Sequence, residues 1–436
     1  MVSLGCSKNQ VDAERLLAML SRDGFAISPD VADCDVVVIN TCGFIEDAKR
    51  ESIESILEFA ALKEAGDLRA VVVTGCLAER YREEMAKEMP ELDVILGIGK
   101  NANICAAVRR ALDGEKVVEF GPKSGLSLEG ERILAGPPYS AYLKVAEGCN
   151  NRCSYCAIPL IRGDFRSRRM EDIVAEAEAL AERGVTELNV VAQDTTRYGE
   201  DLYGELALPR LLDRLCEIGK LHWVRVLYCY PERVTDRLLD TMARQPKLVK
   251  YMDVPVQHAV GRVLQQMNRK GGEESLEALM QRIRRRVPGV VLRTTLITGF
   301  PGEADEDFAR LCEFVKRCRF DRLGCFAYSR EEDTPAAEME DQLDEETKRR
   351  RAEIIMELQM EIALEAGKSR VGKDLEVLCE GFDDEAGLWA GRSYMDAPDI
   401  DTKVYFSAER DVRPGAYVRV RVTASDEYDL MGEMVP

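Results

Sequence analysis

Short β-rich runs alternate with amphipathic helical stretches in two successive blocks of this chain, and this alternation constrains the fold more than any other feature. In the first block, residues 1–120, the predicted strands lie at 36–40, 70–75 and 93–96, and the predicted helices at 47–65 and 79–88. Strands that alternate with helices build a parallel sheet, because each parallel crossover needs a covering helix. The first block therefore predicts an α/β domain with a doubly wound parallel sheet.

The alternation restarts after a connector that contains glycine and proline, and it defines a second predicted domain at residues 135–366. Its predicted strands lie at 141–146, 187–192, 224–229, 251–256, 292–298 and 323–328, and its predicted helices at 170–183, 208–218, 235–244, 274–286 and 303–317. Six strands with intervening helices favour a partial (β/α)6 barrel, whose functional groups gather at the carboxyl ends of the strands.

The third predicted domain, residues 367–436, follows a long charged helix at 344–366 that we expect Gly367 to end. It contains no helical pattern. Short strands are predicted at 375–379, 388–394, 403–406 and 417–424, separated by turn residues. This pattern is typical of a small all-β barrel.

The chain carries 79 acidic and 60 basic residues, which gives a net charge of −19. A dedicated nucleic-acid coat protein needs a basic surface, so this balance argues against that class and favours neutral or basic partners. Neither an apolar run of 18 residues nor a signal-peptide pattern occurs, so we expect a cytoplasmic protein without a membrane partner. Thiols stay reduced in the cytoplasm, which argues against a disulfide framework for the 14 cysteines.

Three of these cysteines, Cys149, Cys153 and Cys156, lie within eight residues directly after the first predicted strand of the second block. A loop of this length lets three thiolates converge on one metal centre. Three ligands on a four-iron cluster leave one iron open, whereas a closed structural zinc site needs four ligands. The spacing therefore favours an iron–sulfur cluster, and a zinc site that borrows a distant fourth thiol is the alternative.

Three other cysteines, Cys6, Cys42 and Cys76, occupy equivalent positions, because each follows a strand and precedes a helix in the first block. In an open parallel sheet these points meet at the crevice outside the carboxyl ends of the strands. Helix N-termini also favour thiolate charge. We expect a second three-cysteine cluster here, and three small core residues are the alternative. The remaining cysteines are interpreted as packing residues: Cys34, Cys105, Cys216, Cys229, Cys312, Cys318, Cys325 and Cys379.

The C-x3-C-x2-C spacing, with Tyr155 before the last cysteine, resembles the signature of radical S-adenosylmethionine (SAM) enzymes. The resemblance implies that the open iron binds the amino and carboxylate groups of SAM, which is cleaved to a 5′-deoxyadenosyl radical. It also implies that Gln193 and Asp194 face the methionine amino group. Gly299 and Glu303 belong to a loop that the resemblance places beside the adenine, although the same residues suit an ordinary turn between a strand and a helix.

Two three-cysteine sites, a partial barrel and a terminal β-barrel that is similar to a TRAM domain together resemble the radical SAM methylthiotransferases over essentially the whole chain. The resemblance implies an enzyme with two 4Fe–4S clusters and SAM. One cluster generates the radical that abstracts a hydrogen atom, and the auxiliary cluster carries the sulfur that is methylated and delivered. It also implies an electron donor such as flavodoxin or ferredoxin.

Several stretches resemble the branch of this family that modifies a ribosomal protein, among them VSLGCSKNQVDAE, AIPLIRGDFRSR and YSREEDTPAA. The tRNA-modifying branch usually has Gln-Met-Asn after the first cysteine, where this chain has Ser7, Lys8 and Asn9. Residues 368–436 contain nine basic and fifteen acidic residues, a net charge of −6 that should repel phosphate and attract a basic protein.

These observations predict transfer of a methylthio group to the β-carbon of an aspartate in the basic small-subunit ribosomal protein twelve. A tRNA adenosine methylthiotransferase is the alternative within the family, and a non-enzymatic zinc-binding ribosome-associated protein is the alternative outside it. The basic stretch Arg162–Arg169 is the candidate to grip the target aspartate, although its arginines suit a solvated surface equally well. Two positions depart from the branch pattern: Ser7 and Asp333 stand where proline and glycine are common.

Overall fold

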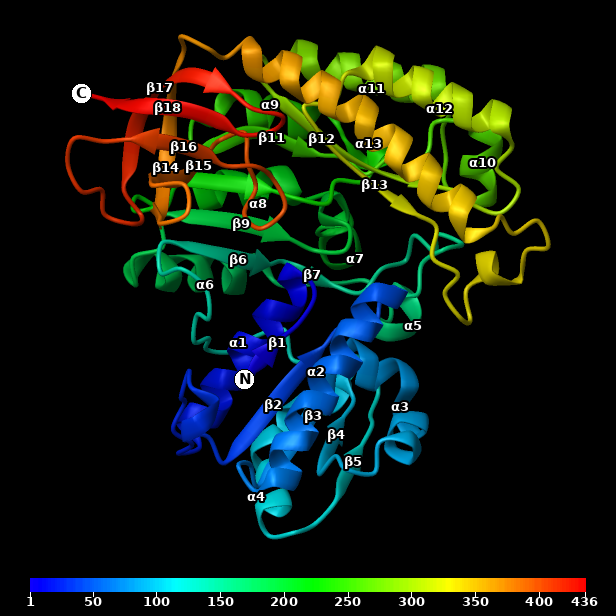
Figure 1. Cartoon of the computed structure of the whole chain (residues 1–436), viewed down its shortest axis with the longest axis vertical. Helices are drawn as coiled ribbons and strands as arrows, with labels where there is room; N and C mark the ends of the chain where they lie inside the picture. Colours follow the sequence, from blue (N-terminus) through cyan, green and yellow to red (C-terminus); the bar gives the residue numbers. More distant parts are fainter.

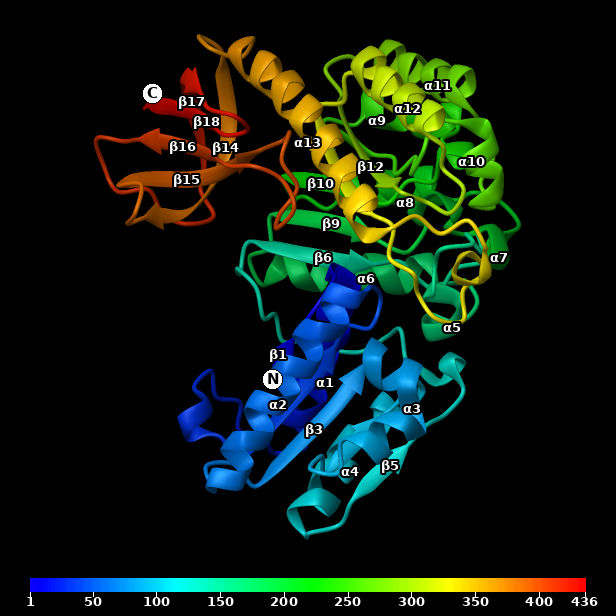
Figure 2. The same cartoon turned by 45° about the vertical axis from the view of Figure 1, so that its right-hand side comes forward.

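The computed structural model describes residues 1–436 and shows three units (Figures 1 and 2). The N-terminal unit, blue to cyan in Figure 1, lies below a green-to-yellow barrel, and a small orange-to-red barrel lies beside that barrel at the top. This arrangement places the first helix of the chain, α1 (Ser7–Arg22), against the first strand of the central barrel.

The N-terminal unit contains a five-stranded parallel sheet with its strands in chain order. The strands are β1 (Val2–Ser3), β2 (Val36–Thr41), β3 (Ala70–Gly75), β4 (Val94–Leu96) and β5 (Val117–Glu119). Besides α1, the helices are α2 (Glu46–Ala65), α3 (Cys76–Glu88) and α4 (Ile104–Leu112). Apolar residues of α1 and α4 cover one face of the sheet and those of α2 and α3 cover the other. The predicted helix-covered parallel sheet is therefore confirmed.

Two details of this sheet differ from the prediction. A further strand at the start of the chain pairs only at Val2 and Ser3, because Gly5 turns the chain out of the sheet with φ of +87°. The edge strand β5 was not predicted, because Val118 and its neighbours form too short a run to show a strand pattern. Neither difference moves the three cysteines away from the carboxyl ends of the strands.

The central unit is an open parallel sheet in the order β13-β12-β11-β10-β9-β6, which confirms the partial (β/α)6 barrel. Its strands are β6 (Ser140–Lys144), β9 (Glu187–Val191), β10 (Trp223–Val226), β11 (Leu248–Asp253), β12 (Val291–Thr298) and β13 (Arg322–Ala327). The covering helices are α6 (Met170–Glu182), α8 (Leu208–Cys216), α9 (Asp236–Arg244), α11 (Glu273–Arg286), α12 (Asp305–Cys318) and α13 (Glu345–Lys368). Shorter elements in its loops are β7 (Ala146–Glu147), β8 (Arg166–Ser167), α5 (Ile158–Arg162), α7 (Glu200–Tyr203) and α10 (Gly261–Gln266).

Several element boundaries in this unit differ from the prediction. Strand β10 ends three residues before its predicted end, because Tyr228 takes a left-handed conformation with φ of +63° and the chain leaves the sheet there, and strand β11 begins and ends three residues earlier than predicted. Gly367 does not end α13, which continues to Lys368. A β-carbon at Gly367 would lie 2.9 Å from that of Ser425, so this glycine permits close packing against the C-terminal barrel.

The C-terminal unit is a closed five-stranded barrel, as predicted, with one further strand at its end. Its strands are β14 (Asp374–Asp383), β15 (Leu388–Ser393), β16 (Val404–Ser407), β17 (Tyr417–Ser425) and β18 (Leu430–Val435). It packs on the face of the central sheet opposite the helices, where Trp223 and Tyr251 meet the apolar interior that includes Leu375 and Phe406. None of the helices in the chain is both long and apolar enough to cross a membrane.

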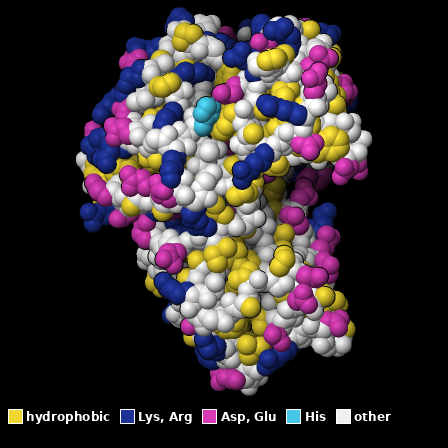
Figure 3. Space-filling model, turned by 90° about the vertical axis from the view of Figure 1, so that its left-hand side faces the viewer, with side chains coloured by type: hydrophobic (Ala, Val, Ile, Leu, Met, Phe, Trp, Pro, Cys, Tyr) yellow, Lys and Arg dark blue, Asp and Glu magenta, His cyan; other side chains and the backbone are white.

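Acidic residues of the C-terminal barrel face the central unit instead of solvent at several positions. Asp396 accepts a hydrogen bond from Arg322 (2.6 Å), and Asp401 lies 3.6 Å from Arg293. On the molecular face that carries this barrel, acidic and basic side chains are interspersed (Figure 3). The net charge of −6 thus overstates the negative surface that the barrel offers to a partner.

The buried pair of Glu187 and Arg392 predicts acid sensitivity of this interface. Arg392 donates hydrogen bonds of 2.7 and 3.0 Å to the Glu187 carboxylate. Burial opposes ionisation of Glu187, but Arg392 outweighs burial and lowers the pKa from 4.5 to about 2. The carboxylate therefore contributes stability that is complete above pH 4.5 and is lost as the pH falls toward 2, about 3 kcal/mol in total. Urea unfolding between pH 6 and 2.5 should show this loss, and Glu187→Gln should flatten it.

Candidate active site

The cysteines of the C-x3-C-x2-C motif lie in the loop between β7 and α5, at the carboxyl end of β6. The loop folds back on itself, because the Cys149 N–H donates to the Gly163 carbonyl (3.1 Å) and the Cys156 N–H donates to the Cys153 carbonyl (3.1 Å). Burial and the neighbouring Asp194 and Cys153 raise the pKa of the Cys149 thiol to about 11. Burial followed by Cys153 raises the pKa of Cys156 as well. The three thiols are thus near neighbours inside one loop.

Polar side chains from distant parts of the barrel surround this loop. Arg269 lies after α10, and its Nη1 is 3.8 Å from the Cys153 sulfur and 3.5 Å from the Tyr155 hydroxyl. The Tyr230 hydroxyl, beyond the end of β10, is also 3.8 Å from the Cys153 sulfur. Arg269 and Tyr230 are not predictable from the sequence, because neither belongs to a local motif and only the barrel brings them to the loop.

Gln193 and Asp194, which are predicted to face the SAM amino group, differ in whether they have a side-chain oxygen free to accept a hydrogen bond. Gln193 donates from Nε2 to Glu147 (3.0 Å), and its buried Oε1 has no hydrogen-bond partner. Both oxygens of Asp194 are engaged, one by Thr196 (2.6 Å) and the other by Asn151 (2.9 Å) and Arg233. Gln193 therefore presents a free acceptor, whereas Asp194 holds the cysteine loop through Asn151.

Gly299 and Glu303 form one hydrogen-bonded turn after β12. The Gly299 N–H donates to Glu303 Oε2 (2.9 Å), and Arg351 of α13 donates to Oε1 (2.8 Å). Gly299 has a φ of +70°, and a β-carbon there would lie 2.4 Å from Lys348 Cγ, so a side chain has no room. Glu303 acts as a brace for this turn, because both of its oxygens already have donors.

Cys6, Cys42 and Cys76 lie together at the carboxyl ends of β1, β2 and β3. A β-carbon built on Gly5 would lie 2.8 Å from the Cys42 sulfur, so the turns that carry Cys6 and Cys42 touch. Burial, followed by the Cys76 thiol, raises the pKa of Cys42 to about 12. Desolvation opposes ionisation of Cys6, but Lys8 and Arg162 outweigh it and lower the pKa of this thiol.

In neither set do the three cysteine side chains surround a position for a single metal ion. No group of three His, Cys, Asp or Glu side chains in the chain is placed to hold a single metal ion. The thiolates of a mononuclear zinc site all lie about 2.3 Å from one ion, whereas the thiolates of a 4Fe–4S cluster bind different irons and surround a volume. Two sets of neighbouring thiols and the unpartnered Gln193 oxygen fit the clusters and the SAM ammonium that the resemblance implies.

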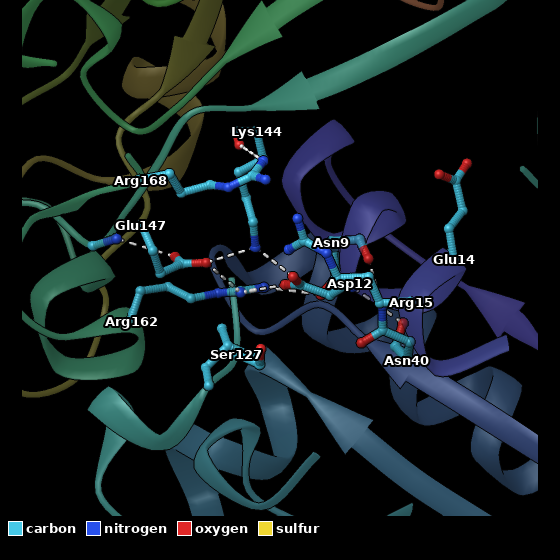
Figure 4. A network of polar contacts seen from close by, with 12 residues as sticks. Asn9, Asp12, Glu14, Arg15, Asn40, Ser127, Lys144, Glu147, Arg162 and Arg168 are labelled. Atoms are coloured by element: carbon cyan, nitrogen blue, oxygen red, sulfur yellow. Dashed lines mark hydrogen bonds and ion pairs between the residues drawn. The ribbon is translucent and has the colours of Figure 1, made fainter. Parts of the chain in front are cut away.

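Arg162 lies in a buried polar network across the interface between the N-terminal unit and the barrel (Figure 4). Its Nη2 donates to the Cys76 sulfur (3.2 Å) and to Asn9 Oδ1 (2.9 Å), and its Nη1 donates to Asp12 (2.6 Å). Glu147, just before the motif cysteines, lies 3.4 Å from the same nitrogen. Lys144 completes the buried network by binding both Asp12 and Glu147.

Three arginines of the Arg162–Arg169 stretch, which is predicted to grip a substrate carboxylate, are engaged inside the protein, and only Arg169 is exposed. Arg162 is buried with all its partners inside the protein. Arg166 donates to backbone carbonyls of the connector, and Arg168 donates to Glu129 and to the Lys144 carbonyl. Sequence analysis could not separate these arginines from solvated ones, because their acidic partners are distant in sequence.

A second contact fixes the N-terminal unit at the opposite edge of the central sheet, beyond β13. Glu331, in the YSREEDTPAA stretch after β13, accepts a hydrogen bond from Arg80 of α3 (2.7 Å) and lies 3.3 Å from Lys49 of α2. Arg80 also donates to the Gly43 carbonyl beside Cys42 (2.9 Å). The barrel thereby holds the turn that carries one of the N-terminal thiols.

Comparisons with known proteins cover all three units. Residues 1–97 match the family described as "Uncharacterized protein family UPF0004", residues 143–315 match the radical SAM superfamily, and residues 371–435 match the TRAM domain. Among solved structures, the chain resembles the radical SAM methyltransferase TsrM from Kitasatospora setae, with a TM-score of 0.55 and 15% identity over 88% of this chain and 78% of that one. At this identity the likeness shows the fold alone.

Curated relatives are far more similar and span the whole chain. The ribosomal protein uS12 methylthiotransferase RimO of Pelotomaculum thermopropionicum is 51% identical over 100% of this chain and 98% of the relative. The RimO proteins of Desulforamulus reducens and Clostridioides difficile are 48% and 45% identical, over 100% and 99% of this chain and 98% of each relative. The chain therefore belongs to the RimO family of ribosomal protein uS12 methylthiotransferases.

Proposed function

We propose that this chain is a radical SAM enzyme that transfers a methylthio group to the β-carbon of an aspartate in ribosomal protein uS12. The observation that carries the proposal is a pair of three-thiol sites on opposite sides of one buried interface, joined by Arg162 through its hydrogen bond to Cys76. Sulfur insertion at an unactivated carbon needs a hydrogen abstractor and a sulfur carrier close to each other, and ordinary acid–base side chains can serve as neither.

The six cysteines divide into two ligand sets in this proposal. Cys149, Cys153 and Cys156 would hold the 4Fe–4S cluster with an open iron, and Cys6, Cys42 and Cys76 would hold the auxiliary 4Fe–4S cluster. When bound, the first cluster and SAM supply the 5′-deoxyadenosyl radical that abstracts hydrogen, and the auxiliary cluster with a second SAM supplies the methylated sulfur.

The protein's own residues position these groups. Gln193 Oε1 would accept a hydrogen bond from the SAM ammonium, because it is a buried acceptor without a partner. Asp194 holds the loop of the first cluster through Asn151, and Arg269 places a cation near the Cys153 sulfur. Tyr155 lies within that loop, and the turn braced by Gly299 and Glu303 would border the adenine.

A basic ribosomal protein is the proposed partner, with tRNA as the disfavoured one. The name of the related enzymes specifies uS12, and no basic footprint suited to tRNA is apparent in a chain with net charge −19. An acidic electron donor such as flavodoxin or ferredoxin would contact Arg152, which lies between Cys149 and Cys153. The Arg152 side chain is 71% exposed. These partners place the reaction in the cytoplasm.

The reconstituted enzyme, incubated with SAM and a reductant, should add one methylthio group to uS12 and none to tRNA, as mass spectrometry of both products would show. A modified tRNA with unmodified uS12 would refute the proposal and support the tRNA branch. A colourless protein that contains zinc would support the non-enzymatic alternative, because iron–sulfur proteins absorb visible light.

A further inference from the structure

Lys8 is a cation at the interface that lacks the carboxylate partner its neighbours have. It stands on the first turn of α1, two residues after Cys6, and only 8% of the residue is exposed. No carboxylate oxygen lies within 4.0 Å of its ammonium, whereas Arg162, Lys144 and Arg80, which cross the same interface, all form ion pairs. Ammonium groups that are largely withdrawn from water are usually paired with an anion, so Lys8 is placed to accept a carboxylate from a bound molecule.

The Lys8 side chain reaches from the N-terminal unit to the mouth of the barrel. Its ammonium lies 3.5 Å from the centroid of the Tyr228 ring. Tyr228 follows β10, and its backbone N–H donates to Asp253 at the end of β11 (2.9 Å). Carboxyl ends of barrel strands are where such enzymes bind their substrates. Lys8 thus joins the turn of an auxiliary-site cysteine to the substrate-binding end of the barrel.

The nearby Asp253 does not neutralise Lys8. One of its oxygens accepts from Arg293 (3.0 Å) and the other from the Tyr228 N–H. The ring of Tyr228 offers Lys8 a cation–π contact, which compensates for only part of the lost hydration. The Lys8 ammonium can therefore bind one further carboxylate without breaking an existing ion pair.

We propose that Lys8 binds the side-chain carboxylate of the target aspartate and so determines the specificity of the proposed reaction. This inference rests on the proposed function and adds the residue that recognises the substrate. A carboxylate held on Lys8 fixes the adjacent methylene, which is the β-carbon in aspartate. In glutamate the same contact would hold the γ-carbon there, and in asparagine the charge is missing. The contact therefore selects both the residue type and the carbon atom.

The test is a double-mutant cycle measured by binding, because binding is defined even for a substrate that does not react. Wild-type enzyme and Lys8→Met, both reconstituted and SAM-loaded without reductant, are titrated with uS12 and with uS12 in which the acceptor aspartate is asparagine. We expect Lys8→Met to weaken binding of uS12 about 10- to 100-fold. The asparagine variant of uS12 should bind wild-type enzyme as weakly as uS12 binds Lys8→Met. Lys8→Met should not weaken the binding of this asparagine variant any further.

Two further variants and the iron content complete the test. Lys8→Arg should retain most of the binding because it keeps the charge, and Lys87→Met, at an exposed lysine of α3, should match wild type. Equal weakening of both substrates by Lys8→Met would overturn the assignment, as would loss of about half its iron, since Lys8 would then serve the auxiliary site. If wild type binds uS12 but modifies only tRNA, the proposed function fails together with this inference.

Discussion

Replacement of Cys153 by serine is expected to reduce SAM cleavage to the level of a protein-free control. Cys153 is the central thiol of its loop, and the loop has no fourth cysteine that could replace it. Without this cluster no electron can reach SAM, so 5′-deoxyadenosine should not form. Iron should fall from about eight to about four per chain, because the auxiliary site is independent. Chromatography of the reaction products and a colorimetric iron assay would measure both effects.

Cys216→Ser is the matched control, because Cys216, the last residue of α8, is also buried but packs in the apolar core. It should keep the full iron content and SAM cleavage while losing some thermal stability. Normal SAM cleavage by Cys153→Ser would contradict the proposed ligand set, and loss of iron from Cys216→Ser would show that the assay reports general unfolding.

Arg162→Met is expected to abolish methylthio transfer while SAM cleavage persists. The substitution leaves Asp12 and Glu147 buried with Lys144 as their only shared cation, a change that should lower the free energy of unfolding by about 3–5 kcal/mol. The N-terminal unit then loses one of its buried attachments to the barrel, and Cys76 loses its hydrogen-bond donor. Chemical denaturation, together with parallel assays of 5′-deoxyadenosine and modified uS12, would separate these effects.

Arg214→Met serves as the control for charge, because Arg214 of α8 is exposed and its guanidinium forms only a 3.5 Å ion pair with Glu217. Arg162→Lys keeps the charge but loses the paired geometry of the guanidinium. It should therefore be more stable than Arg162→Met but still transfer the methylthio group poorly. If Arg162→Met cleaved SAM and modified uS12 in wild-type proportion, the arginine would have no role in joining the two sites.

Much of the fold could be predicted because periodic patterns are local. The strands at Ala70–Gly75 and in the C-terminal barrel followed from β-rich runs between turn residues, and the closed barrel is confirmed. The boundaries that failed depended on contacts with other elements. Gly367 was predicted to end the helix, but it lies within α13, where the absence of a side chain leaves room for Ser425 of β17.

The grouping of thiols was also predictable in outline. Cys149, Cys153 and Cys156 are close in sequence, and Cys6, Cys42 and Cys76 each follow a parallel strand, so the sheet brings them to one edge. Their roles as cluster ligands stay a prediction until iron is measured in the variants.

The sequence by itself determined which elements form, where the thiols gather and which family the chain resembles, because those properties depend on spacing along the chain. Only the tertiary structure decided that Arg162 is an internal connector, that Gln193 rather than Asp194 has a free acceptor, and that Lys8 meets the Tyr228 ring but no carboxylate. Whether a charged side chain is paired, orphaned or solvated depends on residues from other units, and long-range packing of the three units alone brings those residues within bonding distance.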